Sequence, residues 1–554
     1  MRKIPVLISG AGSVGLSLAA ELGWRGVQCL AVEQEGGLNP HPRANAVANR
    51  TMEYYRRWGI DEAISNAGVP PEHPANYYWV SSLHGRKIHG ISLPPFKKIR
   101  EIQNPGGYAK EEHMWSPYLK TITGQNELET IILQFIQQLE CVDFRFNSRL
   151  MDFHEDQHGV TCLIKHAETG QEEDIRTQYL LACDGGRSMV REKLGIKLTG
   201  HADMANFVSI YFKAPDFMNS HNFGNANIYF PLHQKYAGYI LNWDGGTTFT
   251  YHLKLKESQH WKEIDPIQAI HSVLGRSLTI KILSTQPWSA HALTAESYGR
   301  DRTFLVGDAA HLFTPTGGFG MNTGVSDALD IALKIQATLQ GWGGQNLLRS
   351  YSIERQPIGV RNTLEAADCF NQLDEVMQHG DELDIDGCKG ERLRQALGTK
   401  LKAQEKLISS SGTLLGYRYK HSPIIIKDAS PEPKDDPRVY IPTARPGHRA
   451  PHIWLEEGIS ILDLLGPNFT LLCFEKSPKH VANFEKIAKE IGFLVKILPL
   501  DDREAAKLYG SNFVLVRPDL MVAWRANELP ERPNSILDIV RGEQPPQPDF
   551  SALF

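Results

Sequence analysis

The first 35 residues show apolar and polar positions in an order typical of strand, turn, helix and strand. Residues 4–9 form a short apolar run, residues 13–23 carry small and apolar side chains at helical spacing, and residues 28–32 are again apolar. Runs of this length fit buried strands, and the segment between them fits a helix. A glycine-rich turn separates the first two segments. The pattern predicts a βαβ unit at the N-terminus.

A region rich in β-branched and aromatic residues follows in two pieces, 73–107 and 203–290. Turn signals such as Asp244-Gly245-Gly246 separate its apolar segments, which indicates short strands. The strands expected there are 206–213, 227–230, 236–243 and 247–254; elsewhere we expect helices at 43–59, 127–139, 322–339 and 351–379 and buried strands at 177–182 and 303–306. This arrangement predicts a sheet inserted into the domain that begins with the βαβ unit.

The composition changes around residues 429–449, where prolines recur and charged residues gather. Such a stretch is typical of a linker. After it, short apolar runs at 469–474, 493–497, 513–516 and 521–524 predict the strands of a separate small α/β domain.

Composition and charge exclude several classes of function. A chain of 554 residues is long enough for about three or four domains. Its 59 Lys and Arg nearly balance 64 Asp and Glu without a basic block, so nucleic-acid binding is not expected. The N-terminal apolar run is too short for a signal peptide or a membrane span. The seven cysteines are scattered without a Cys-x-x-Cys pair, so we expect no disulfide framework, no metal site and a cytoplasmic location.

Three glycines follow the first predicted strand in the pattern Gly10-x-Gly12-x-x-Gly15, and Glu33 follows the second strand. Gly10 permits the tight turn, Gly12 allows the backbone to approach a pyrophosphate, and Gly15 allows the helix to pack on the strand. A carboxylate at position 33 binds ribose hydroxyls and repels a 2′-phosphate. In this context a glycine turn without a ligand is the less frequent alternative. The segment predicts FAD or NAD, rather than NADP, as the bound nucleotide.

Two further segments place a carboxylate after a predicted strand. The first is Asp184-Gly185-Gly186-Arg187-Ser188, which by itself is more often a turn with an N-capping residue. The second runs from Val306-Gly307-Asp308 to a glycine-rich loop at 315–322. Such a loop directs backbone N–H groups and a helix N-terminus toward a site that holds negative charge, as reduced flavin requires. In this order, the three segments predict a pocket for FAD.

The three segments resemble those of the single-component FAD-dependent aromatic hydroxylases, flavoprotein monooxygenases that include phenol hydroxylases and aromatic-polyketide hydroxylases. The resemblance also rests on Pro42-Arg43-Ala44 before Arg50-Thr51-Met52-Glu53, on Gln125 before Leu128-Glu129, and on Leu347-x-x-x-Tyr351-x-x-Glu354-Arg355. Past the linker, residues 445–452, 516–519 and 523–525 look like the thioredoxin-like C-terminal domain found in one branch of the family.

This resemblance implies an α/β fold in three parts: a Rossmann-like FAD-binding domain, an inserted mixed β-sheet substrate domain and a C-terminal thioredoxin-like domain. The expected boundaries are 1–72, 108–202 and 291–410 for the discontinuous FAD-binding domain, 73–107 and 203–290 for the substrate domain, 411–439 for the linker and 440–554 for the C-terminal domain. The C-terminal domain is expected to support stability or association, which leaves a homodimer open.

The resemblance also implies a role for each matching position. The adenosine ribose is assigned to Glu33, the pyrophosphate to Asp184, the ribityl region to Gln125 and Asp308, the pyrimidine edge of the flavin to Gly320 and Met321, and the place where oxygen and substrate meet to Pro315. The expected cofactor-binding residues are Gly10, Gly12, Gly15, Glu33, Arg43, Gln125, Asp184, Asp308, Gly318, Gly320, Met321 and Asn322, and the expected catalytic residues are Arg43, Asn45, Tyr239 and Pro315.

The reaction that the resemblance implies begins with reduction of FAD by NAD(P)H and continues through a flavin C4a-hydroperoxide formed with O2. The distal oxygen is then transferred to an electron-rich aromatic substrate, phenolic or polycyclic. The sequence shows no second nucleotide fingerprint, which agrees with a reductant that binds transiently. It leaves NADPH and NADH open, although the family usually uses NADPH.

One position of the flavin-proximal loop departs from the phenol hydroxylases, which carry an aspartate where this chain has Asn45. An asparagine orients a hydroxyl but is no base at neutral pH, so simple phenol hydroxylation is in doubt. Baeyer-Villiger oxygenation on the same scaffold and a non-redox flavin protein such as an isomerase stay open as alternatives. Asp330 and Leu333 replace an asparagine and a tryptophan common in the family, and we expect both to affect helix packing.

The residues that contact the substrate are harder to identify. Aromatic and polar residues of the inserted sheet are candidates, but alternation alone does not show which face they occupy. They are Tyr229, Tyr239, Asn242, Trp243 and Thr250, with His221, His233 and His252. For each, core packing or plain surface exposure is the more frequent role.

Overall fold

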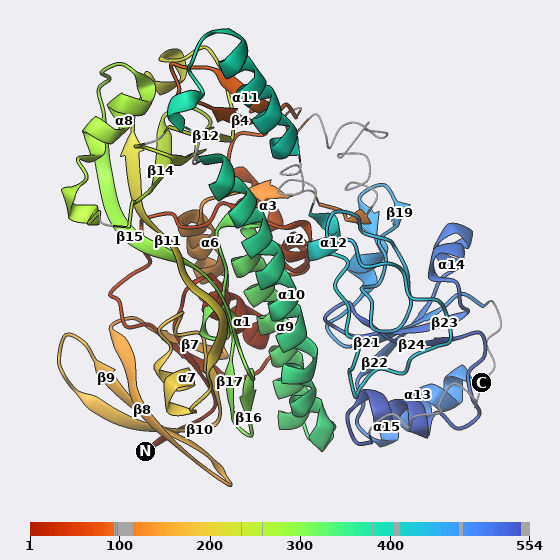
Figure 1. Ribbon diagram of the computed structural model, residues 1–554. Helices are drawn as coiled ribbons and strands as arrows, with labels where there is room; N and C mark the ends of the chain where they lie inside the picture. Colours follow the sequence, from red (N-terminus) through yellow and green to blue (C-terminus); the bar gives the residue numbers. More distant parts are fainter. Residues whose placement is uncertain are drawn as a thin grey trace.

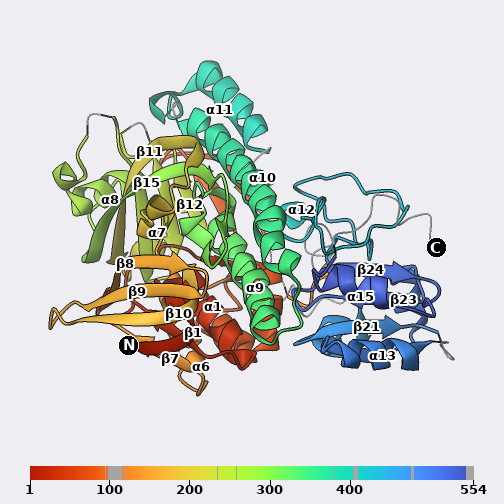
Figure 2. The same ribbon diagram turned by 90° about the horizontal axis from the view of Figure 1, so that it is seen from below.

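The computed structural model describes residues 1–93, 95, 97, 115–118, 120–233, 235–257, 259–377, 380–402, 410–475 and 480–544. Parts of the expected segments 73–107, 108–202, 291–410 and 440–554 lie outside these residues, as does the end of the helix expected at 351–379. Two large sheets lie next to each other, and two long helices separate them from a smaller C-terminal domain (Figure 1). The view from below shows the same order (Figure 2).

The first sheet contains the predicted N-terminal βαβ unit. Its strands are β1 (Arg2–Ser9), β2 (Cys29–Val32), β7 (Val142–Arg145), β8 (Ser148–Asp156), β9 (Gly159–His166), β10 (Glu172–Ala182), β16 (Gly299–Arg300) and β17 (Thr303–Leu305). The main path is β16-β17-β10-β1-β2-β7, with β1 parallel to β2 and β10. Ser9 lies opposite Ala182, which lies opposite Leu305. The three cofactor motifs therefore meet at the carboxyl edge of one sheet, where ligands bind in open α/β folds.

Helices pack around this sheet and continue toward the C-terminal domain. They are α1 (Ser13–Trp24), α2 (Asn49–Arg57), α3 (Asp61–Asn66), α6 (Gln125–Ile136), α7 (Met189–Lys193), α9 (Phe319–Leu339), α10 (Gln345–Met377) and α11 (Gly387–Leu401), with the short turns η3 (Gly307–Ala309), η4 (Thr316–Gly318) and η5 (Gly380–Glu382). Apolar side chains such as Leu7, Leu22 and Leu181 are fully buried between sheet and helices. Helix α1 packs against α6 and α9, which brings the first and third motifs together.

The helix expected at 43–59 begins only at Asn49, so the first part of that prediction is wrong. The residues before it are extended, and β3 (Ala46–Val47) pairs with β6 (Thr121–Ile122). Pairing with a distant segment overrides the helical periodicity of residues 43–48. The loop that carries Arg43 lines the cavity next to the carboxyl edge of the first sheet.

The second sheet is the predicted inserted sheet. Its strands are β4 (Tyr77–Val80), β5 (Lys87–Ile91), β11 (Leu198–Lys213), β12 (Ile228–Pro231), β13 (Gly238–Asn242), β14 (Thr248–Lys254), β15 (Lys281–Ala295) and β18 (His311–Leu312), in the order β18-β15-β11-β14-β13-β12-β4-β5. The sheet is mixed, because β12 pairs with β4 in parallel and its other pairs are antiparallel. The sequence did not predict β15, which crosses the expected domain boundary at 290/291. Helix α8 (Pro266–Leu274) and the turns η1 (Phe217–Asn219) and η2 (Trp261–Glu263) complete this part.

The described part of the C-terminal domain contains a four-stranded sheet, a two-stranded sheet and three helices. Its elements are β19 (Trp454–Glu456), β20 (Ile459–Ser460), η7 (Ile461–Leu464), β21 (Phe469–Cys473), α13 (Val481–Glu490), β22 (Val495–Pro499), α14 (Arg503–Tyr509), β23 (Phe513–Val516), β24 (Val522–Ala526) and α15 (Asn534–Val540). The sheet order is β22-β21-β23-β24, in agreement with a thioredoxin-like arrangement.

The expected linker, 411–439, is packed rather than loose. It begins with α12 (Ser411–Leu414), and Ile424 and Ile426 are buried in the core of the C-terminal domain. The backbone N–H of Ile426 donates to the carbonyl of Ala523 at 2.9 Å. The proline-rich, charged stretch therefore lies between two domains but packs against the C-terminal one. We propose the domain boundaries given above.

Candidate active site

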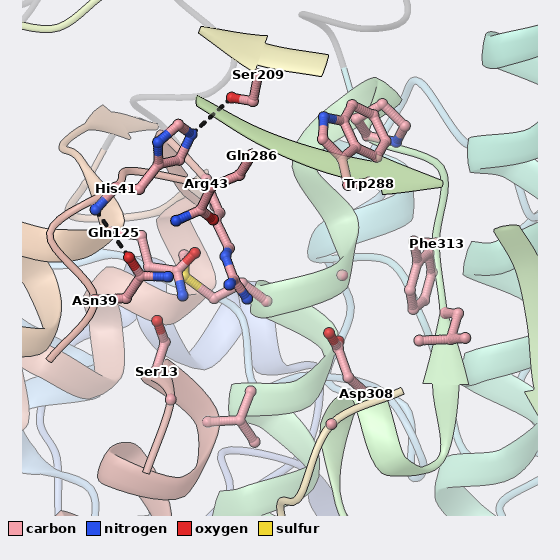
Figure 3. Close-up of a pocket in the computed structure, with 18 of the residues that line it drawn as sticks. Ser13, Asn39, His41, Arg43, Gln125, Ser209, Gln286, Trp288, Asp308 and Phe313 are labelled. Atoms are coloured by element: carbon pink, nitrogen blue, oxygen red, sulfur yellow. Dashed lines mark hydrogen bonds between the residues drawn. The ribbon is translucent and has the colours of Figure 1, made fainter. Parts of the chain in front are cut away.

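A cavity of about 1360 Å³ lies between the carboxyl edge of the first sheet and the second sheet. Pockets for drug-sized ligands usually measure roughly 300–1,000 Å³, so this one has room for a large cofactor and a second molecule. Figure 3 shows Ser13 and Asp308 at one end of it, Ser209 and Trp288 at the other, and Arg43 between them. Both sheets thus contribute to one site.

The glycines of the first motif have three different environments. Gly10 has a φ of +97°, and a Cβ on it would meet the carbonyl oxygen of Cys183 at 2.3 Å. A Cβ on Gly15 would meet the carbonyl oxygen of Gly10 at 2.1 Å. At Gly12 the nearest atom to such a Cβ is Oε1 of Glu129, at 3.9 Å. Gly10 and Gly15 therefore serve the turn and its packing, while Gly12 leaves space for a ligand to approach the backbone.

Two helix N-termini open into the cavity without a side-chain cap. Helix α1 has Gly12 as its N-cap, and α9 has Gly318, which lies in the left-handed region with a φ of +68°. Neither helix has an acidic residue in its first turn. The first N–H groups of a helix have no partner within it, and they attract negative charge. Each helix therefore offers a site for an anionic part of a cofactor.

Glu33 lines the cavity and also stabilises the glycine turn that contains Ala11. Its Oε2 accepts a hydrogen bond from the backbone N–H of Ala11 at 2.8 Å, and Oε1 accepts one from the N–H of Glu35 at 3.1 Å. A carboxylate has about four acceptor positions, so both oxygens keep capacity for ribose hydroxyls.

Arg43 and Asp308 are charged residues that reach into the cavity. Both side chains are exposed there, and Arg43 makes no hydrogen bond or ion pair with the part of the chain that the structure describes. The protein walls around the exposed Asp308 carboxyl nevertheless raise its pKa by desolvation, an effect that His311 and Arg43 partly oppose. The guanidinium is therefore available to a ligand that carries negative charge.

Gln125 and Asp184 line the same cavity from other elements. Gln125, the first residue of α6, donates from Nε2 to Oε1 of Glu129 at 2.7 Å. Asp184 follows β10, and its Oδ2 accepts from the N–H of Val190 at 3.3 Å. Its Oδ1 is buried without a hydrogen bond among the described residues, and burial raises the pKa of this carboxyl. A buried oxygen without a partner is uncommon and indicates a missing ligand or water.

The glycine-rich loop after β18 supplies one wall. Pro315, Gly318, Gly320 and Met321 all line the cavity. Asn322 does not, although the sequence placed it among the cofactor-binding residues. Its Oδ1 accepts from the N–H of Ala48 and the hydroxyl of Thr51, and its Nδ2 donates to two backbone carbonyls, at 2.9 and 2.6 Å. Because all four positions of this amide are used, its side chain fixes the Arg43 loop against α9 and has none left for a cofactor.

Asn45 also lines the cavity, in the same loop as Arg43. Its backbone carbonyl accepts from the N–H of Thr123 at 2.9 Å, and its Nδ2 is buried without a partner among the described residues. An amide there donates or accepts a hydrogen bond but removes no proton at neutral pH. Among the described residues no carboxylate hydrogen-bonds the Asn45 amide in place of the aspartate.

Aromatic rings form the end of the cavity that belongs to the second sheet. Tyr239 stacks on His252 with ring centroids 4.5 Å apart, and Phe207 stacks on Trp288 at 4.4 Å. Burial raises the pKa of the Tyr239 hydroxyl, and burial together with His41 lowers the pKa of His252 to about 3. The two stacked pairs meet edge to face, with His252 at 81° to Trp288, and their rings form an apolar, uncharged wall.

Of the other substrate-contact candidates, only His252 joins Tyr239 in the cavity. Tyr229, Asn242, Trp243, Thr250, His221 and His233 are not among the lining residues. The Tyr229 hydroxyl donates to the Gly224 carbonyl at 2.6 Å, and Trp243 Nε1 donates to Thr250 at 2.7 Å. These side chains stabilise the inserted sheet. Strand alternation could not reveal this, because both faces of the sheet are covered.

Sequence reasoning missed three residues of the site. His41 bridges two serines of the second sheet, with Ser209 at 2.7 Å and Ser284 at 2.6 Å from its ring nitrogens. Trp288 lies on the unpredicted strand β15, next to Pro287, which hid the strand pattern. Glu129 was visible only as part of the Gln125 motif, without a function of its own. Its burial in the cavity wall could not be read from the sequence.

The residues present fit FAD. An open Gly12, two uncapped helix N-termini, a guanidinium without a partner and the unpaired oxygen of Asp184 all leave binding groups for a dinucleotide. The described residues contain no cluster of His, Cys, Asp and Glu able to hold a metal ion. Nor is any described helix long and apolar enough to cross a membrane.

Comparison with known proteins agrees with this site. Residues 3–366 match the family model described as FAD binding domain, and residues 443–541 match the one described as aromatic-ring hydroxylase, C-terminal. A tetracenomycin A2 monooxygenase-dioxygenase of Streptomyces glaucescens is 32% identical over 562 residues, which cover 96% of this chain and 94% of the relative.

Solved structures show the same fold. The rebeccamycin biosynthetic enzyme RebC with reduced flavin is 31% identical and has a TM-score of 0.86, covering 98% of this chain and 99% of its own. A ternary complex of aklavinone-11 hydroxylase with FAD and aklavinone is 28% identical and has a TM-score of 0.81, with the same two coverages. The chain therefore belongs to the FAD-dependent aromatic hydroxylases of the flavoprotein monooxygenase family.

Proposed function

We propose that this protein hydroxylates a planar aromatic substrate, phenolic or polycyclic, with NAD(P)H and O2 as co-substrates. The observation that carries the proposal is a cavity in which the dinucleotide turn and an aromatic wall face each other. The cavity volume of about 1360 Å³ favours a polycyclic substrate over a simple phenol. The similar aklavinone-11 hydroxylase, whose structure contains FAD and aklavinone, supports this class.

The cofactor contacts that we propose follow from the residues at the first sheet. Gly10, Gly12 and Gly15 shape the turn at the pyrophosphate, with Asp184 nearby, while Glu33 receives the adenosine ribose. Gln125 and Asp308 are assigned to the ribityl chain, and Arg43 to a negatively charged part of the cofactor. Gly318, Gly320 and Met321 are assigned to the pyrimidine edge, and Asn322 fixes the loop beside them.

Bound FAD would supply acceptance of a hydride from NAD(P)H and activation of O2 at carbon C4a of its ring. The protein's own part is positioning and solvation. The N-terminus of α9 stabilises negative charge on the pyrimidine edge, and the aromatic wall excludes water from the reacting ring. Pro315 shapes the space between them. Tyr239 and Asn45 are uncharged groups that orient a substrate hydroxyl rather than deprotonate it.

The test is to purify the protein with FAD and to follow oxidation of NADPH and NADH with hydroxylated polycyclic quinones and with simple phenols. We expect substrate-stimulated oxidation, fastest with the polycyclic compounds, and a product heavier by one oxygen atom taken from isotopically labelled O2. An FAD-loaded protein that shows no stimulated oxidation with any compound would favour the non-redox alternative.

A second candidate is Baeyer-Villiger oxygenation of a cyclic aromatic ketone. It is favoured by Asn45, because that reaction needs no base to activate a phenol and the Arg43 loop supplies none. The two reactions add the same mass but differ in product. A lactone identifies ring insertion, and a new phenolic hydroxyl identifies hydroxylation.

A further inference from the structure

Glu129 is a buried carboxyl in the wall of the cavity. It lies on α6 and is 3% exposed. Its Oε1 accepts two hydrogen bonds, from the Ser13 hydroxyl at 2.9 Å and from Gln125 Nε2 at 2.7 Å. Among the described residues no side chain donates a hydrogen bond to Oε2, and the backbone N–H of Ser13 also interacts with the carboxyl. One oxygen is thus fixed by the protein, and the other remains available to a ligand.

The position of Glu129 connects it with the cofactor turn. Oε1 is the nearest atom to a Cβ built on Gly12, at 3.9 Å, and Ser13 begins helix α1. Gly12 is the residue whose backbone a pyrophosphate approaches in this motif. A diphosphate bound at Gly12 therefore comes close to the carboxyl of Glu129.

Among the groups with the largest effect on Glu129, Arg43 is the cation. Tyr55 of α2 is a titratable group that also interacts with Glu129. The Tyr55 hydroxyl lies 3.2 Å from the Ser17 hydroxyl and is neutral and buried. Burial raises the pKa of the Glu129 carboxyl, while its hydrogen bonds and Arg43 oppose this only in part. A diphosphate would add like charge and favour the protonated form further.

We propose that Glu129 binds the FAD diphosphate as a neutral carboxylic acid that donates a hydrogen bond from Oε2, so that FAD binding takes up one proton. A protonated carboxyl keeps an acceptor for Ser13 and Gln125 and gains an O–H donor for a phosphate oxygen. An ionised carboxylate in the same place would repel the phosphate. This role concerns retention of the cofactor and does not depend on which substrate is oxygenated.

The proposal fixes the sign of a pH effect. FAD binds the protonated form, so the pKa of Glu129 is higher in the complex than in the apoprotein. Affinity is then highest below the pKa of the apoprotein and falls as pH rises toward the pKa of the complex. Within that interval one proton per FAD corresponds to about a tenfold rise in Kd per pH unit.

The experiment measures the Kd of FAD for apoprotein by quenching of flavin fluorescence from about pH 5 to about pH 9. Calorimetry in two buffers of different ionisation enthalpy gives the protons taken up. For the wild type we expect the Kd to rise about tenfold per pH unit over part of this range. Glu129→Gln copies the protonated acid, with an amide donor in place of the O–H, and should change its Kd less than about twofold across the range.

Asp308→Asn is the matched control, because Asp308 is the other carboxyl of the cavity whose pKa Arg43 affects. It should bind FAD more weakly and keep the wild-type pH dependence. The proposal is overturned if the wild type takes up no proton, if the pH dependence survives in Glu129→Gln, or if it disappears in Asp308→Asn. It is also overturned if Glu129→Gln binds FAD much more weakly than the wild type at low pH. None of these readings requires turnover, so failure of the hydroxylation proposal would leave them unchanged.

Discussion

The Nη1 atom of Arg517 lies 2.7 Å from Oε1 of Glu354, and neither side chain is exposed to solvent. Arg517 follows β23 of the C-terminal domain, and Glu354 belongs to α10. Arg517 also pairs with Asp330 and Asp519, both at 2.8 Å, and Lys334 pairs with Asp330 and Glu354, both at 2.6 Å. The C-terminal domain is thus joined by buried charges to helix α9, whose first turn lines the cavity.

Arg517→Met should destabilise the protein strongly, because it leaves Asp330 and Glu354 with Lys334 as their cation and removes the ion pair of Asp519. Removal of one partner of a buried ion pair costs about 3–5 kcal/mol, whereas an exposed pair contributes about 0–1 kcal/mol. Lys486→Met, which removes the exposed pair with Glu490, is the control. Urea unfolding measures both free energies. Equal stability of the two variants would contradict the role given to the network.

This network also shows where sequence reasoning ends. The replacement of a family asparagine by Asp330 was visible, but its partner Arg517 is 187 residues away in the chain. Gly10, Gly12 and Asp308 were predicted because each belongs to a continuous segment whose spacing has a physical meaning. Trp288 belongs to no such motif. It lines the cavity only because its face of the second sheet is turned toward the first sheet. The cavity wall at the first sheet could therefore be predicted, and most of the wall at the second sheet could not.

Asp308→Ala should weaken FAD retention, because the carboxylate faces the cavity at the carboxyl edge of the first sheet. Loss of a hydrogen bond that involves a charged group costs about 1.5–3 kcal/mol, which corresponds to about a tenfold to hundredfold rise in Kd. Equilibrium dialysis or flavin fluorescence measures it. An unchanged Kd would remove Asp308 from the cofactor site.

Gly12→Ala and Gly10→Ala should fail in different ways. Gly12 has ordinary dihedral angles, with a φ of −69°, and space around a Cβ, so its variant should fold and bind FAD at least about tenfold more weakly. Gly10 has a positive φ and a Cβ would collide with the Cys183 carbonyl, so its variant should lose stability. Thermal unfolding of the apoproteins separates the two effects. Normal FAD affinity in a folded Gly12→Ala protein would place the pyrophosphate elsewhere.

Trp288→Ala should raise the KM for the aromatic substrate and leave the FAD content unchanged. Its ring stacks on Phe207 and lines the cavity at the end away from Ser13 (Figure 3). Loss of an apolar contact of this size costs about 1.5–3 kcal/mol, or about tenfold to hundredfold in KM. Trp243→Phe, a change outside the cavity, should leave KM within about twofold. Steady-state kinetics with one substrate compares the two variants. Equal KM values would show that the substrate does not bind against Trp288.

Four of the buried histidines should make the protein sensitive to mild acid. Burial lowers the pKa of His252 to about 3 and of His41, His221 and His448 to about 4. In the unfolded chain their pKa is about 6.5, so between about pH 4 and pH 6.5 the unfolded state binds more protons than the native state. The free energy of unfolding therefore falls as pH drops through that window, with each histidine contributing up to about 1.4 kcal/mol per pH unit.

His252→Phe isolates one of these contributions. Both ring nitrogens of His252 are buried without a partner among the described residues, so an apolar ring fits the site and removes only the titration. The difference in unfolding free energy between the variant and the wild type should grow in favour of the variant by about 1.4 kcal/mol per pH unit as pH falls from about 6 to about 5. Urea titrations at these two pH values measure it. A difference that does not change with pH would mean that His252 titrates equally in the folded and unfolded chain, in conflict with its place between Tyr239 and Trp288.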